Sequence, residues 1–231
     1  MRGGALRASS VLARRGGEIA IFDTGLAHHA ASLVAALALE GITPQDVTLV
    51  FNTHAHVDHS HNNALFPRAG IYCSKRDRDW TRALHEVLAR VTRPGPEHAL
   101  PFYPAMAAST YNPKIVRKLL AIEKLLWDES RWGGTDRAIW LEEVEPPSGI
   151  SVIETPGHAP HHVSFAIETG GRAVLVCGDA LLLREDLNAR VALMPPWDVS
   201  AYRASHDRIR NFDGVIVPGH DEPFDNTPVR E

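Results

Sequence analysis

Apolar residues recur along this chain in short runs, and each run ends at glycine, proline or polar residues. Short apolar or alternating runs bounded by such turn residues are typical of β-strands. The pattern predicts seven strand regions, at 18–25, 47–54, 69–74, 149–158, 161–169, 172–180 and 214–220. The alternation before the Arg-Gly-Gly turn at 15–17 predicts one more strand, paired in a hairpin with the first of these.

Helical patterns lie between the predicted strands. Residues 28–41 are rich in alanine and leucine and stop at Gly41, which is a common signal for the end of a helix. Residues 200–212 form a second helical stretch just before the last predicted strand. Strands and helices that alternate in this way predict an α/β protein in which helices cover a sheet.

The segment 75–140 departs from this alternation. Two stretches, 81–91 and 112–127, place apolar residues at helical spacing, and the second begins with Asn112 as N-cap and Pro113 in its first turn. A proline-broken loop that carries aromatic residues separates them. We therefore expect one domain over 1–231 with a helical insertion at 75–140, which acts either as a lid over a substrate or as a dimer contact.

Composition limits the classes of partner. A chain of 231 residues can bury a substantial core, and a net charge of −4 gives no basis for a nucleic-acid partner. No run approaches the ~20 apolar residues needed to cross a bilayer. Cys73 and Cys177 form neither a disulfide framework nor a thiolate metal motif. The arginine-containing start is interpreted as a strand hairpin and not as a targeting sequence. A cytoplasmic location is therefore expected.

Histidine and aspartate side chains follow four of the predicted strands, at the edge where open α/β sheets bind ligands. These residues are His54, His56, Asp58, His59, His158, Asp179 and His220. His54 and His56 stand two apart in an extended segment, so they point to the same side and can bind one ion. Imidazole and carboxylate are ligands of zinc and similar divalent metals, and seven donors exceed what one tetrahedral ion needs. The count predicts two ions that share a bridging carboxylate.

A histidine-rich surface turn is the competing interpretation of 54–59, and the agreement of three later strand ends argues against it. Neither spacing nor strand position singles out the remaining histidines as ligands. They are His28, His29, His61, His85, His98, His161, His162 and His206.

The string THAHVDH at 53–59 resembles the H-x-H-x-D-H signature of the metallo-β-lactamase superfamily. DTG at 23–25, TPGH at 155–158, GDA at 178–180 and PGH at 218–220 are similar to its other motifs and follow in the same order. The resemblance runs from about 18 to 222 apart from the helical segment, and it implies a four-layer αββα sandwich with two metals in a cleft between the β-layers. It also implies the ligand sets: His54, His56 and His158 for one ion, Asp58, His59 and His220 for the other, Asp179 as the bridge and Asp23 as a structural support.

Differences from the family motifs limit which subfamilies this chain resembles. The β-lactamases of this family mostly lack an aspartate at the position of Asp179. Glyoxalase II proteins append a helical domain after the corresponding histidine, whereas eleven residues follow His220 in this sequence. RNA-processing members carry large added domains. Quorum-quenching lactonases are more similar, especially over 159–169, although they place a tyrosine where this chain has Leu182. Small animal members share the strings DVTLV, LFP and VPGH, and some of those are linked to RNA cleavage.

The expected function is a dinuclear metal-dependent hydrolase, with two zinc ions as the first choice and iron, manganese or cobalt as alternatives. It would use a metal-bound hydroxide on a small ester, lactone or thioester with an apolar part, with Asp58 as proton carrier. The residues expected to contact the substrate are Phe102, Tyr103, Met106 and Tyr111. A phosphodiesterase or ribonuclease of the same fold and a mononuclear iron enzyme similar to sulfur dioxygenases stay open as alternatives, and so does a homodimer.

Overall fold

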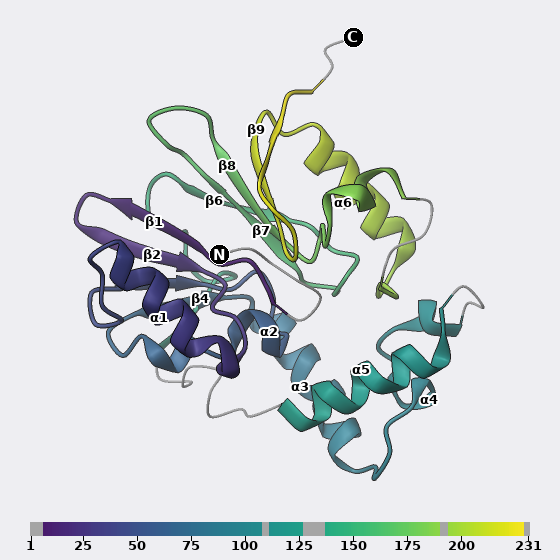
Figure 1. Ribbon diagram of the computed structural model, residues 1–231. Coiled ribbons are helices and arrows are strands. Elements are labelled where there is room, and N and C mark those ends of the chain that lie inside the picture. Colours follow the sequence, from purple (N-terminus) through teal and green to yellow (C-terminus); the bar gives the residue numbers. More distant parts are fainter. Residues whose placement is uncertain (1–6, 108–110, 127–136, 190–193, 229–231) are drawn as a thin grey trace.

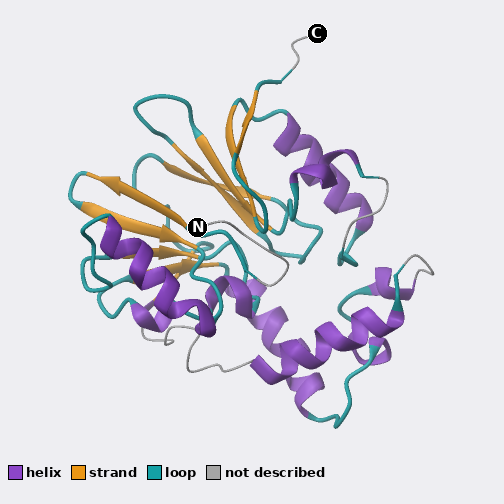
Figure 2. Ribbon diagram, in the orientation of Figure 1, coloured by secondary structure: helices purple, strands orange, loops and turns teal. Residues whose placement is uncertain are grey.

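Residues 7–107, 111–126, 137–189 and 194–228 are described by the computed structural model of this chain, and the structural statements below concern these ranges. They contain two five-stranded sheets that face each other, with helices on the outside (Figures 1 and 2). None of the helices in these ranges combines the length and the apolar character needed to cross a membrane. Both cysteines, Cys73 and Cys177, are buried as free thiols and form no disulfide.

The first sheet has the strand order β1-β2-β3-β4-β5. Its strands are β1 (Val11–Arg15), β2 (Glu18–Phe22), β3 (Leu49–Phe51), β4 (Gly70–Cys73) and β5 (Ala138–Trp140). β1 pairs antiparallel with β2, and the other neighbours are parallel. The tight β1–β2 turn uses Gly16 and Gly17 at φ of 56° and 90°, which glycine adopts easily. This hairpin confirms the two strands predicted around the Arg-Gly-Gly turn.

The second sheet has the strand order β10-β9-β8-β7-β6. Its strands are β6 (Ile150–Glu154), β7 (Val163–Ile167), β8 (Val174–Gly178), β9 (Gly214–Pro218) and β10 (Phe224–Asn226). Only β8 and β9 run parallel. All seven predicted strand regions contain an observed strand, each shorter than predicted because the flanking turn residues lie outside the ladder.

Alternating side chains on each strand explain the four layers. Phe22 and Phe51 stack at 4.8 Å and meet Phe165 of the opposite sheet, so one face of each sheet is buried against the other. The intervening positions, such as Ile21 and Val50, point to the outer face. There α1 (Ala30–Leu39) covers the first sheet, and α6 (Val199–Arg210) covers the second. The predicted αββα sandwich is confirmed.

Three further helices form what we call the helical block, residues 75–126, which Figure 1 shows beside the two sheets. They are α3 (Lys75–Ala89), α4 (Pro96–Ala99) and α5 (Pro113–Leu126), with a 3₁₀ turn η3 (Pro104–Ala107) between the last two. Their shared core is Leu84, Leu88, Ala99, Tyr103, Val116 and Leu120. α5 begins at Pro113, and the Asn112 side chain accepts a hydrogen bond of 3.0 Å from the Lys114 amide, as expected for an N-cap.

The end of the expected insertion belongs to a sheet. Residues 138–140, within the segment 75–140, form β5 and pair with β4. Trp127, the last residue of the second predicted helix, lies outside the described residues. The other short helices within the described ranges are η1 (Ala27–His29), α2 (Val57–Ser60), η2 (Asn63–Leu65) and η6 (Arg184–Asn188).

Candidate metal centre

The carboxyl ends of five strands deliver polar side chains to one region. β2 is followed by Asp23, and β3 is followed by residues 52–60, which we call the metal loop and which include α2. β6, β8 and β9 are followed by His158, Asp179 and His220. Parallel neighbours such as β2 and β3, or β8 and β9, end at the same edge of their sheet, which brings these residues together.

The two sheets approach each other closely next to the metal loop. The Val163 amide donates a 3.0 Å hydrogen bond to the carbonyl of Thr53. Gly178 has a φ of 51°, and a Cβ at this position would stand 2.3 Å from Thr53 Oγ1. Only glycine fits this approach without displacing Thr53, the residue that precedes the first histidine of the loop.

Three histidines form the first cluster. His54 Nε2 lies 3.0 Å from His56 Nδ1, and His158 Nε2 lies 2.9 Å from the same His56 nitrogen. His54 and His158 are buried and His56 is half-buried. The three nitrogens are close enough to bind one ion together.

The second cluster consists of Asp58, His59 and His220. Asp58 Oδ2 lies 3.4 Å from His220 Nε2 and 3.9 Å from His59 Nε2. Asp58 and His59 belong to α2, the short helix that begins directly after His56. Asp58 keeps 23% of its side chain exposed, whereas the His59 side chain is fully buried.

Asp179 lies between the two clusters. Its Oδ1 is 3.1 Å from His59 Nε2 and 3.2 Å from His220 Nε2. Its Oδ2 is 3.5 Å from His158 Nε2. One carboxylate thus faces both clusters, so the structure brings together all seven residues that the sequence singles out.

This donor set fits divalent cations. His59 Nε2 and Asp179 Oδ1 are buried 3.1 Å apart, in a geometry that is poor for a hydrogen bond. Buried polar atoms without well-aligned partners are costly, and a cation bound by both would satisfy them. Imidazole nitrogens and carboxylate oxygens are the ligands that zinc and related metals take in proteins.

The charge states differ between the clusters. Burial and the neighbouring histidines lower the pKa of His54. Burial lowers the pKa of His56 in spite of the nearby carboxylates, and it lowers the pKa of His158 to about 3. These imidazoles are therefore neutral, the form that binds a metal. Burial also opposes a charge on His220, but the carboxylates of Asp179 and Asp58 outweigh it and raise the pKa of His220 to about 9.

Asp23 supports two members of the site. Its Oδ2 lies 2.7 Å from His59 Nδ1 and accepts a 2.8 Å hydrogen bond from the Thr53 hydroxyl. That hydroxyl oxygen is also 3.1 Å from His54 Nδ1. Asp23 Oδ1 accepts from the Thr53 amide at 2.9 Å. The sequence predicts a supporting role for Asp23 but not the contribution of Thr53.

An amide network surrounds the carbonyl of His59. Asn52 donates to this carbonyl at 3.3 Å, and Asn63 donates to the Asn52 side chain at 2.7 Å. The Thr24 hydroxyl donates to Asn63 at 2.9 Å, and the Thr24 amide donates to the His59 carbonyl at 2.6 Å. These hydrogen bonds fix the turn from β3 into α2, and no sequence pattern singled out the residues that make them.

An apolar pocket of about 510 Å³ opens onto both clusters. Of the four residues expected to contact a substrate, Tyr103 and Met106 line this pocket, whereas Phe102 and Tyr111 are not in its lining and pack against the core of the helical block. α5 supplies most of one wall, with Ile115, Val116, Leu119, Leu120, Ile122, Glu123 and Leu126. The acidic lining residues are Asp58, Glu123 and Asp179, and the described lining residues include no lysine or arginine.

Two neighbouring histidines belong to neither cluster. His61 and His162 are buried beside the site and are absent from the ion-binding groups found among the described residues. His162 Nδ1 lies 3.0 Å from the Thr155 hydroxyl, and its ring packs against His54 at 4.8 Å. His162 therefore supports the ring of His54 from behind.

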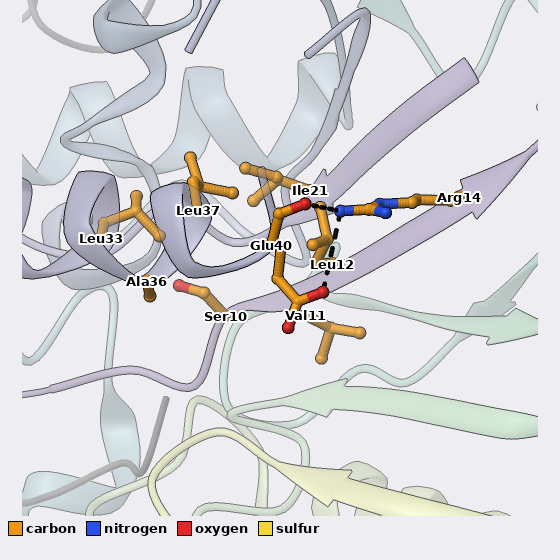
Figure 3. Close-up of a pocket in the computed structure, with 9 residues that line it drawn as sticks. All are labelled: Ser10, Val11, Leu12, Arg14, Ile21, Leu33, Ala36, Leu37 and Glu40. Carbon is orange, nitrogen blue, oxygen red and sulfur yellow. Dashed lines mark hydrogen bonds and ion pairs between the residues drawn. The ribbon is translucent and has the colours of Figure 1, made fainter. Parts of the chain in front are cut away.

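A second pocket, of about 470 Å³, lies between α1 and the β1–β2 hairpin (Figure 3). Arg14 donates to the Glu40 carbonyl and lies 3.7 Å from the Glu40 carboxylate at one side of this pocket. None of the seven donor residues lines it. This pocket is therefore separate from the candidate metal centre.

Comparisons with known proteins agree with this geometry. A family model described as "Metallo-beta-lactamase superfamily" matches residues 3–220. Metallo-beta-lactamase domain-containing protein 1 of Mus musculus is 30% identical over 209 residues, which cover 88% of this chain and 60% of the mouse protein. The probable metallo-hydrolase YqjP of Bacillus subtilis is 26% identical over 231 residues, which cover 91% of this chain and 66% of that protein. The chain thus spans about 60% of the length of the mouse relative.

Solved structures share the fold. AidC, described as a dizinc quorum-quenching lactonase, superposes with a TM-score of 0.64 at 17% identity. The match covers 91% of this chain and 71% of AidC. At this identity the likeness concerns the fold alone.

Proposed function

Because this chain belongs to the metallo-beta-lactamase superfamily, we propose that it is a metal-dependent hydrolase with a dinuclear centre. The observation that carries the proposal is the position of Asp179, whose two oxygens each face one cluster of histidines. His54, His56 and His158 would hold one cation. Asp58, His59 and His220 would hold the other, with Asp179 shared.

Divalent cations in these positions supply Lewis acidity toward the substrate oxygen and bring the pKa of water toward neutrality. The donor set favours zinc, and iron, manganese or cobalt are compatible with the same ligands. Asp23 and Thr53 orient His59 and His54 by hydrogen bonds to the ring nitrogens that face away from the site. The protein thus presents its donor atoms already oriented.

Asp58 is the residue proposed to carry a proton during the reaction. It lines the apolar pocket, and its side chain is half-buried. Among the members of the two clusters only His56 is also half-buried, and the others are buried. A carboxylate in this position can hold a proton on one oxygen and deliver it to the leaving group of a substrate in the pocket. His59 and His220, the other members of its cluster, are both buried.

The pocket supports a neutral substrate with an apolar part, such as an ester, lactone or thioester. Aliphatic side chains of α5 face the metal residues across a space large enough for a small acyl group. A phosphodiester or RNA substrate would be favoured by a basic lining, and the described lining residues include three acids and no lysine or arginine. A mononuclear iron enzyme would need fewer ligands than the seven that meet here.

Metal analysis of the purified protein, followed by an activity screen, tests this proposal. We expect about two divalent ions per chain, since seven donors exceed the needs of one tetrahedral ion. We also expect hydrolysis of neutral lactones or thioesters in preference to a phosphodiester with the same leaving group. A single iron per chain, or a preference for the phosphodiester, would overturn it.

A further inference from the structure

Three consecutive residues of the metal loop are each held by a side chain of the helical block. Asp77 on α3 accepts a 2.7 Å hydrogen bond from the Ala55 amide. The hydroxyl of Tyr103, just before η3, lies 2.8 Å from His56 Nε2. Although burial opposes it, His85 and the Val57 amide lower the pKa of the Glu123 carboxyl on α5, so this carboxylate lies near position 57. The block therefore contacts the loop at positions 55, 56 and 57, from three separate segments.

The contact to His56 acts on a proposed ligand directly. His56 Nδ1 faces His54 and His158, and His56 Nε2 faces the Tyr103 oxygen. A neutral imidazole carries one proton, so a ring that binds a cation through Nδ1 must carry its proton on Nε2. The Tyr103 oxygen lies where it can accept that proton in a hydrogen bond.

The same arrangement occurs at two other histidines. His54 Nδ1 meets the Thr53 hydroxyl, and His59 Nδ1 meets the Asp23 carboxylate. In each case an oxygen holds the ring nitrogen that faces away from the cluster. For His54 and His59 this oxygen comes from the sandwich, whereas for His56 it comes from the helical block.

We propose that Tyr103 is a positioning residue that fixes the His56 ring with Nδ1 directed into the first cluster. This inference rests on the metal centre proposed above. Tyr103 is 5% exposed, and Trp80 packs edge-on against its ring at 5.2 Å, so its hydroxyl is held in place. Tyr103 also lines the apolar pocket. One side chain would therefore form part of the pocket wall and orient a proposed metal ligand.

A role in packing alone would need the ring of Tyr103 but not its hydroxyl. Tyr103→Phe keeps the ring and removes only the oxygen that meets His56. Tyr111→Phe is the matched control, because it removes a phenolic hydroxyl from the same block away from the pocket lining. Thermal unfolding of both variants checks that each is folded.

The experiment is a titration of the metal-free proteins with Zn²⁺ and Co²⁺ against a chromophoric chelator. We expect Tyr103→Phe to bind one of two ions about 10- to 100-fold more weakly than the wild type, as for the loss of other groups that orient metal ligands. The Co²⁺ absorption band of that ion should also change. Tyr111→Phe should match the wild type in both measurements.

Nitrogen NMR of ¹⁵N-histidine-labelled, zinc-loaded wild type gives a reading that does not depend on any variant. The His56 proton should reside on Nε2. A proton on Nδ1, or wild-type affinity and spectra in Tyr103→Phe, would overturn the role of Tyr103 while leaving the metal centre intact. A wild type that binds no ion would instead overturn the proposed function, and this inference with it.

Discussion

The carboxylate of Asp77 accepts a hydrogen bond from the amide of Ala55, the residue between His54 and His56. Both partners are almost fully buried. Asp77→Ala leaves the Ala55 amide without its acceptor, which we expect to lower the free energy of unfolding by about 1–3 kcal/mol. Urea unfolding measures the change.

Asp79→Ala is the control for that variant. Asp79 lies on the same helix but on its exposed side, where it pairs with Lys75 and Arg82. Surface ion pairs contribute little, so its loss should change stability by less than about 1 kcal/mol. Equal effects of the two variants would show that the contact to Ala55 is unimportant.

Asp179→Ala should remove the group that faces both clusters. We expect bound metal to fall to about one ion per chain or fewer, and turnover to fall by more than ~100-fold, since even groups that only orient metal ligands account for 10- to 100-fold. Mass spectrometry of metals in the dialysed protein, with a steady-state assay, makes the measurement. His161→Gln, a half-buried histidine outside both clusters, should retain wild-type metal content.

Leu119→Trp should fill part of the pocket wall formed by α5. With p-nitrophenyl esters as substrates, we expect kcat/KM for a ten-carbon acyl chain to fall about tenfold relative to acetate, because the larger side chain takes the space of the longer chain. Leu125→Trp serves for comparison, since Leu125 is 80% exposed and is absent from the lining. A similar loss in both variants would argue against this wall as an acyl site.

Glu142 should give the start of α3 a pH-dependent stability. Its carboxylate accepts hydrogen bonds from the Ser74 hydroxyl at 2.7 Å and the Lys75 amide at 3.0 Å. Although burial opposes it, these hydrogen bonds lower the pKa of Glu142 to about 2. The folded state therefore binds this proton more weakly than the unfolded state, so the stabilisation is complete above a pH of about 4.5 and is lost as the pH falls toward 2.

Glu142→Gln should accordingly cost about 1 kcal/mol at pH 7, a value reduced from the full shift because solvent screens a partly exposed group. The difference from wild type should shrink in urea unfolding at pH 3.5. Glu143→Gln, an exposed neighbour, should show no such trend. A constant difference between pH 7 and pH 3.5 would refute the assignment.

The meeting of the seven histidine and aspartate residues could be predicted from the sequence because each stands within a few residues of a strand end, where local pattern and residue type suffice. β5 and β10 were not predicted, since β5 lies in the segment interpreted as a helical insertion and β10, Phe-Asp-Asn, contains no apolar run. The pairing of Tyr103 with His56 spans 47 residues, and only the packing of the helical block brings the two together.

The aromatic loop shows the same limit in another form. Phe102, Tyr103, Met106 and Tyr111 share one segment of the sequence, which predicts substrate contacts for all four. In the structure, Tyr103 and Met106 line the pocket while Phe102 and Tyr111 pack among the helices. Which way each side chain faces depends on the turn between α4 and α5, and residue type alone does not specify it.

The contacts between residues 55–57 and the helical block have a consequence for protein engineering. A graft that replaces 75–126 with a foreign segment, in order to accept a different substrate, would also remove Asp77, Tyr103 and Glu123. Such a chimaera would lose its cofactor more readily than its parent, unless the donor segment supplies equivalent acceptors at those three places. Selection of variants of this chain for a new substrate would therefore also have to select for metal binding.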